Sequence, residues 1–112
     1  MLKRIWGLSV ASMVLLTGAA SAATAFCETT GSQGSAESGL VSMNGQVIVS
    51  GSNNGSGTAY HYFKRQINYF PDETIANFST APKGSYSRTL SVNTGRYYVN
   101  VSGRTSWTKA VN

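Results

Sequence analysis

Apolar and polar residues alternate with a period of two over two stretches late in the chain, residues 86–92 and 97–101. Such alternation is typical of strands with one face on a core and the other in water. The stretches are separated by Asn93-Thr94-Gly95, whose residue types tolerate the positive φ of a tight turn. The pattern predicts a β-hairpin over residues 86–103. Because a single hairpin is not stable alone, other strands must cover it.

A second apolar segment, Leu40–Ser50, has the pair Asn44-Gly45 in its middle. Asn-Gly is a strong signal for a two-residue hairpin turn, which would divide the segment into two short strands. A glycine inside a strand also marks a β-bulge, and in that case the segment is one long strand. The sequence leaves both alternatives open.

Three more segments predict strands, namely Thr58–Phe70, Thr74–Thr80 and Thr105–Val111. The first is the most aromatic part of the chain. A helix is the alternative there, but its aromatic density and the Gly-rich loop before it favour β structure. Loops rich in Gly, Ser, Asn and Pro separate the segments at 51–57 and 81–85. We expect an all-β fold, a small antiparallel β-sandwich or open barrel of about six strands.

The first 22 residues have the features of a secretory signal peptide. Lys3 and Arg4 precede an apolar run, and small residues follow where a signal peptidase would cleave, after Ala22 or after Ala25. The apolar run is shorter than the roughly 20 residues that a membrane-spanning helix needs. We therefore expect a helical signal peptide over residues 1–22, no transmembrane span, and a secreted protein that is extracellular, periplasmic or bound to a cell surface.

After the leader, residues 23–39 are rich in Gly, Ser and Thr and predict a flexible, disordered arm before a single β-domain over residues 40–112. Cys27, the one cysteine, lies in this arm behind the bulky Phe26, which disfavours lipoprotein processing. A lone cysteine forms no internal disulfide. The protein is therefore predicted to be a monomer, or a dimer linked through Cys27.

Charge is distributed unevenly along the chain. Beyond the leader there are seven basic and four acidic residues, a net charge of +3. From Thr74 to Asn112 there are five basic residues and no acidic one. A surface formed by this half of the chain should attract anions.

The inventory of catalytic side chains is small. His61 is the only histidine, so a zinc site would need scattered carboxylates as its other ligands, and no serine lies in a nucleophile-elbow motif. We expect no catalytic residues, no metal site and no cofactor. A small secreted nuclease, with His61 as acid and Glu73 as base, is the third-ranked function.

Aromatic and cationic side chains are interleaved on the predicted strands. This arrangement suits anionic polymers, because rings stack on sugars or bases and cations meet negative charge. The expected partner is an anionic cell-envelope polymer, a polysaccharide or lipid head groups, with nucleic acid less favoured. The other interpretation is an ordinary exported β-domain, whose tyrosines line the core and whose cations keep it soluble. The predicted binding residues are Tyr60, Tyr62, Lys64, Arg65, Arg88, Arg96, Arg104 and Lys109.

Together these features indicate a small, exported, cationic, non-enzymatic protein that acts at a bacterial envelope or another polyanionic surface. It would be antibacterial, in the manner of a bacteriocin, or would coat the surface. The alternative is a secreted inhibitor that uses its own exposed aromatic loop to block an enzyme. The two differ in their response to salt, because screening weakens binding to a polyanion more than binding to a neutral protein surface.

Overall fold

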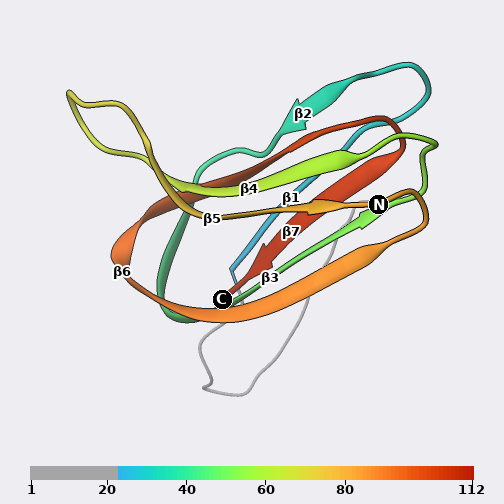
Figure 1. Cartoon of the computed structure of the whole chain (residues 1–112). Coiled ribbons are helices and arrows are strands. Elements are labelled where there is room, and N and C mark those ends of the chain that lie inside the picture. Colours follow the sequence, from blue (N-terminus) through green and yellow to red (C-terminus); the bar gives the residue numbers. More distant parts are fainter. Residues whose placement is uncertain (1–22) are drawn as a thin grey trace.

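The structure, a computed structural model, describes residues 23–112, so the predicted signal peptide lies outside the described residues. The described chain is all-β and antiparallel, as predicted, with seven strands rather than about six (Figure 1). A helix that could cross a membrane is not found in this part of the chain. The strands are β1 (Thr24–Glu28), β2 (Ser35–Glu37), β3 (Val41–Asn53), β4 (Ala59–Arg65), β5 (Glu73–Thr80), β6 (Ser85–Ser102) and β7 (Ser106–Val111).

All seven strands belong to one open sheet in the order β1-β7-β3-β6-β4-β5, with β2 added on β6. The long strand β6 lies between β3 and β4 and so joins the two halves of the sheet, since its first part pairs with β3 and its last part pairs with β4 and β2. Strands β4 and β7 are not neighbours in the sheet, yet His61 of β4 hydrogen-bonds Thr108 of β7. This contact shows that the sheet is curled. Each strand therefore has an inner face toward the core and an outer face toward solvent.

The predicted hairpin over residues 86–103 is wrong, because residues 86–102 belong to the single strand β6. Between the pairs Met43–Gly95 and Gly45–Val92, two residues of β6 lie opposite the single residue Asn44 of β3. This is a β-bulge, and its extra residue shifts the alternation so that apolar residues before and after it both face inward. A bulge and a turn interrupt a period of two in the same way, so the sequence pattern does not distinguish them.

The same bulge decides between the two alternatives for Asn44-Gly45. The pair lies inside the continuous strand β3, and Gly45 has a φ of +90°, which an L side chain rarely adopts. The glycine thus allows β3 to bend at the bulge instead of turning back. None of the three residues Asn93–Gly95 has a positive φ.

The expected flexible arm over residues 23–39 is also wrong for the segments that form β1 and β2. Strand β1 pairs along its whole length with β7, and Ala25 and Cys27 on its inner face are 1% and 5% exposed. Thr29 continues the attachment by donating a 2.6 Å hydrogen bond to the carbonyl of Gly103. The arm was predicted from its composition, but backbone pairing needs no large side chains, and small inward residues suit a strand that lies close to the core.

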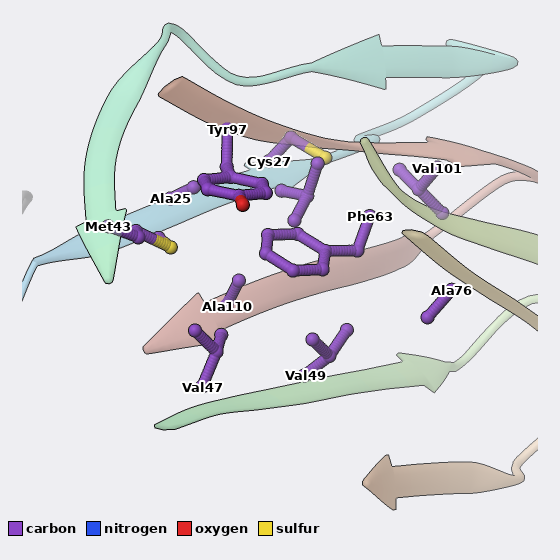
Figure 2. Close-up of a cluster of buried hydrophobic side chains, with 11 residues drawn as sticks. Ala25, Cys27, Met43, Val47, Val49, Phe63, Ala76, Tyr97, Val101 and Ala110 are labelled. Carbon is purple, nitrogen blue, oxygen red and sulfur yellow. The ribbon is translucent and has the colours of Figure 1, made fainter. Parts of the chain in front are cut away.

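The core is built around two stacked rings, Phe63 of β4 and Tyr97 of β6, whose centroids lie 5.1 Å apart (Figure 2). The Tyr97 hydroxyl donates a 2.6 Å hydrogen bond to the Asn93 carbonyl, so this buried polar group is satisfied. The remaining buried members of the cluster are Ala25, Cys27, Met43, Val47, Val49, Ala76, Val99, Val101 and Ala110. With Phe63 and Tyr97 included, the cluster draws on β1, β3, β4, β5, β6 and β7, so the core holds the curled sheet together.

Candidate functional site

The outer face of β4 carries Tyr60, Tyr62 and Lys64, while the alternate residues His61 and Phe63 point inward and are fully buried. Tyr60 is 50% exposed, and the Lys64 ammonium lies 5.9 Å from the centroid of the Tyr62 ring, a cation–π distance. The structure therefore brings together three of the eight residues predicted to bind an anionic partner.

Polar side chains of the neighbouring strands surround these tyrosines. In the sheet register, Tyr60 lies between Ser79 of β5 and Ser102 of β6, and Tyr62 lies between Asn77 and Asn100. An open hollow of about 260 Å³ is lined by Tyr60, Tyr62, Asn77, Phe78 and Ser79. We call this outer surface of β4 and β5, with Lys64 at its end, the tyrosine face. It offers aromatic rings together with amide and hydroxyl groups that both donate and accept hydrogen bonds.

The other predicted binding residues do not join the tyrosine face. Arg65 is on the inner side of β4, where its Nη1 lies 3.9 Å from Oε1 of Glu73. Arg88 lies opposite Val49 on the inner side of β6, at the end of the sheet where that strand pairs with β3 alone.

The last three cations come from three different places in the fold. Arg96 lies near the bulge of β6, and Arg104 lies in the turn between β6 and β7. Lys109 is on the outer face of β7, with its ammonium 5.6 Å from the centroid of the Trp107 ring. Because the inner faces of β4 and β7 contact each other, their outer faces point in opposite directions. The eight residues therefore do not form one continuous surface.

The loop Gln66–Asp72 between β4 and β5, which we call the aromatic loop, carries two exposed rings that the sequence analysis placed inside a strand. Tyr69 is 100% exposed and Phe70 is 71% exposed. The strand prediction for Thr58–Phe70 is confirmed only over β4, which ends at Arg65. The sequence signal for the loop was Pro71-Asp72, which ends the period-two pattern but does not show where the strand stops.

The base of the aromatic loop is fastened to the sheet by Asp72. Its Oδ2 accepts a 2.5 Å hydrogen bond from the Tyr98 hydroxyl, and its Oδ1 accepts a 3.3 Å hydrogen bond from the Ile67 amide. Burial, and then the hydrogen bond to Asp72, raise the pKa of Tyr98 to about 12. Tyr98 therefore remains a neutral donor at physiological pH.

His61 is enclosed in the core. Its Nδ1 lies 2.7 Å from the Thr108 hydroxyl, its Nε2 lies 2.8 Å from the Thr80 hydroxyl, and its ring stacks on Phe78 at 4.7 Å. Burial lowers the pKa of His61, so the neutral form is favoured. The imidazole is fully buried and does not reach a bound phosphodiester, and Glu73 faces Arg65, so the nuclease pair is not assembled.

Cys27 is also removed from solvent. Its burial raises the pKa of the thiol to about 12, so the reactive thiolate is scarce at neutral pH. A disulfide-linked dimer through Cys27 would require β1 to leave the core. The buried position of Cys27 therefore disfavours this linkage, and the oligomeric state stays a prediction.

Among residues 23–112 no three His, Cys, Asp or Glu side chains are grouped so that they could hold a metal ion. Comparisons with known protein families, with curated proteins and with solved structures gave no match for this chain. The case for a function therefore depends on the tyrosine face and the aromatic loop.

Proposed function

We propose that the protein is an exported, non-enzymatic binding protein that attaches to an anionic polysaccharide of a bacterial envelope through the tyrosine face. The observation that carries this proposal is the arrangement of two outward tyrosines, Tyr60 and Tyr62, around a hollow lined by amide and hydroxyl groups, with the Lys64 ammonium beside it. Attachment to the envelope would serve an antibacterial or a surface-coating role.

The chemistry of the tyrosine face suits sugars. The apolar sides of sugar rings pack on aromatic rings, and sugar hydroxyls pair with groups that both donate and accept hydrogen bonds, as the side chains of Asn77, Ser79 and Asn100 do. Lys64 supplies one positive charge for a carboxylate or phosphate substituent on the polymer. A nucleic acid is less well matched, because its binding depends on several cations that follow successive phosphates.

Two lysines in similar environments allow a matched test of this site. Lys64 lies over Tyr62 on the tyrosine face, and Lys109 lies over Trp107 on the opposite side, so Lys64→Gln and Lys109→Gln remove the same charge from equivalent settings. We expect Lys64→Gln to weaken retention of the purified exported protein on isolated envelope polysaccharide by about fivefold, the scale of one solvent-exposed ion pair. Lys109→Gln should leave retention unchanged.

The measurement is the dissociation constant for the isolated polymer, determined at low and at high salt, with a thermal melt of each variant to confirm folding. Equal losses for the two variants would show that net charge alone drives binding, and would contradict a site on the tyrosine face.

The antibacterial and coating roles are separated by a second assay on the same samples. An antibacterial protein should reduce the growth of neighbouring cells in proportion to the amount bound, whereas a coating protein should remain on the producing cells without affecting growth. Absence of the protein from cell-bound material in fractionated cultures would contradict both roles.

A further inference from the structure

The aromatic loop projects away from the sheet between β4 and β5, where it is drawn in yellow in Figure 1. Its tip presents Tyr69 and Phe70, the two most exposed large apolar side chains of the described residues. Scattered surface apolar residues are ordinary, but adjacent aromatic rings at the end of a projecting loop form a distinct feature. An aromatic side chain buries about 150–250 Å² when it is covered, so the tip exposes a large apolar area that a partner could bury.

The base of the loop is fastened to the sheet. It is closed by the hydrogen bonds of Asp72 to Tyr98 and Ile67, and by a 2.9 Å hydrogen bond from the Gln66 amide to the Arg96 carbonyl. Tyr69 has a φ of +66°, a left-handed conformation that is uncommon for a bulky residue. Such conformations persist where the surrounding structure enforces them, and they are concentrated at functional sites. The exposed rings are thus presented by a fixed support, which lowers the entropy cost of using them.

Charge is arranged in two zones along the loop. No residue from Gln66 to Pro71 is charged. At the base, both acids are already engaged, since Asp72 accepts two hydrogen bonds and Glu73 lies beside Arg65. Two further cations at the base, Lys64 and Arg96, form no ion pair within residues 23–112. The loop therefore combines an uncharged aromatic tip with unpaired positive charge directly behind it.

We propose that the aromatic loop inserts its tip into the interface of an anionic lipid bilayer, with Lys64 and Arg96 meeting the lipid phosphates. Aromatic rings partition into the boundary between head groups and acyl chains, and cations behind them are attracted to anionic head groups. This proposal rests on the proposed location at an envelope, but it uses the aromatic loop and a lipid ligand, and it shares only Lys64 with the tyrosine face. The loop would be a second attachment point, which increases total retention when both partners are present.

The competing proposal is that the aromatic loop enters a cleft of another protein, as it would in a secreted enzyme inhibitor. The two unpaired cations behind the tip favour a bilayer, because a row of anionic head groups complements them, whereas a neutral cleft leaves them without a partner. The vesicle measurements below decide between these occupants.

The test uses sedimentation of the purified exported protein with two kinds of vesicles, one of phosphatidylcholine alone and one of phosphatidylcholine and phosphatidylglycerol in equal amounts. The loop variant is Tyr69→Asn combined with Phe70→Ser. Asn is chosen because it tolerates the left-handed backbone at position 69, so the variant should fold normally. We expect the loop variant to bind the anionic vesicles about tenfold more weakly than the wild type, from the loss of two partly buried rings. Lys64→Gln and Arg96→Gln should each weaken binding roughly fivefold.

Insertion depth is measured with Phe70→Trp. Its emission should shift to shorter wavelength on anionic vesicles and should be quenched by lipids with brominated acyl chains. Tyr60→Trp, on the tyrosine face, is the matched reporter and should not be quenched, while the wild type gives the background of Trp107. Unquenched Phe70→Trp, or a loop variant that binds vesicles as the wild type does, would overturn the proposal. Binding to a protein in a 1:1 complex without any vesicle binding would also overturn it and would assign the loop to an inhibitor.

Two variants separate vesicle binding by the loop from polysaccharide binding by the tyrosine face. The double variant Tyr60→Ala/Tyr62→Ala should lose retention on isolated polysaccharide and keep vesicle binding, and the loop variant should show the reverse pattern. Failure of the vesicle test with retention on the polymer intact would refute the loop proposal alone, and the opposite result would refute the polysaccharide site alone.

Discussion

At the scale of single residues, His61 shows how the fold limits the chemistry of a reactive side chain. Both ring nitrogens face threonine hydroxyls, Thr80 on one side and Thr108 on the other, and the ring is fully buried. In the neutral imidazole one nitrogen donates and the other accepts, and each hydroxyl can take the complementary role. Protonation would place a charge in the core without a carboxylate beside it, which explains why burial lowers the pKa of this group.

A dependence of stability on pH follows from His61. Because its pKa is lower in the folded state than the ordinary value of 6.5, the unfolded chain binds more protons at acidic pH. The contribution of His61 to stability is therefore complete above about pH 6.5 and is lost as the pH falls toward the lowered pKa. Thermal melts across this range should show a falling melting temperature for the wild type. The variant His61→Gln should be less stable at neutral pH but should show a flatter profile, and an equal slope in both proteins would contradict this account.

Cys27 gives a second prediction at this scale. With a pKa of about 12 and a position in the core, the thiol should react with a disulfide reagent at a rate limited by opening of β1. Labelling should be slow in buffer and rapid in denaturant, as measured by absorbance of the released reagent. The folded protein should migrate as a monomer on a non-reducing gel. A stable disulfide-linked dimer that still melts cooperatively would contradict the placement of Cys27.

At the scale of strands, the bulge between β3 and β6 allows the single strand β6 to join the two halves of the sheet. Gly45 supplies the positive φ, and a Cβ added at this position would meet no other atom. A substitution there therefore changes stability through the backbone conformation and not through a steric clash. Gly45→Ala should destabilise the protein by about 1–2 kcal/mol, the cost of a left-handed residue. Gly57→Ala is the control, because Gly57 also has open space but no positive φ. Denaturant unfolding measures both, and equal effects would show that the bulge does not depend on this glycine.

Strands β5 and β7 were predictable from the sequence, and they closely match the segments predicted as strands, 74–80 and 105–111, because β-favouring residues there are bounded by turn residues. The continuity of β6 was not, since Asn93-Thr94-Gly95 has the residue types of a turn and its pairing with Asn44 depends on a strand distant in sequence. Strand β1 was missed for a related reason. Its small residues carry little hydrophobic signal, and its stability comes from pairing with β7 at the other end of the chain.

At the scale of the whole molecule, curling of the sheet decides which side chains can act together. Tyr60, Tyr62 and Lys64 were predicted as part of one site and remain together, because alternate residues of a single strand share a face. Lys109 and Arg88 were assigned to the same site from the sequence. They are separated from it because the outer faces of β4 and β7 point apart and because Arg88 lies on the inner side of β6. Sequence spacing within a strand therefore predicted part of the site, whereas the arrangement between strands required the structure.

The most direct test of the polysaccharide-binding site is a titration of the isotope-labelled exported protein with fragments of isolated anionic envelope polysaccharide, followed by amide chemical shifts. The proposed site predicts that shifts concentrate on the tyrosine face, at Tyr60, Tyr62 and Asn77, while the amides of Trp107 and Lys109 on the opposite face stay unchanged. Shifts spread equally over Arg88, Arg104 and Lys109 would show diffuse attraction by net charge, and would contradict a polysaccharide-binding site on the outer face of β4 and β5.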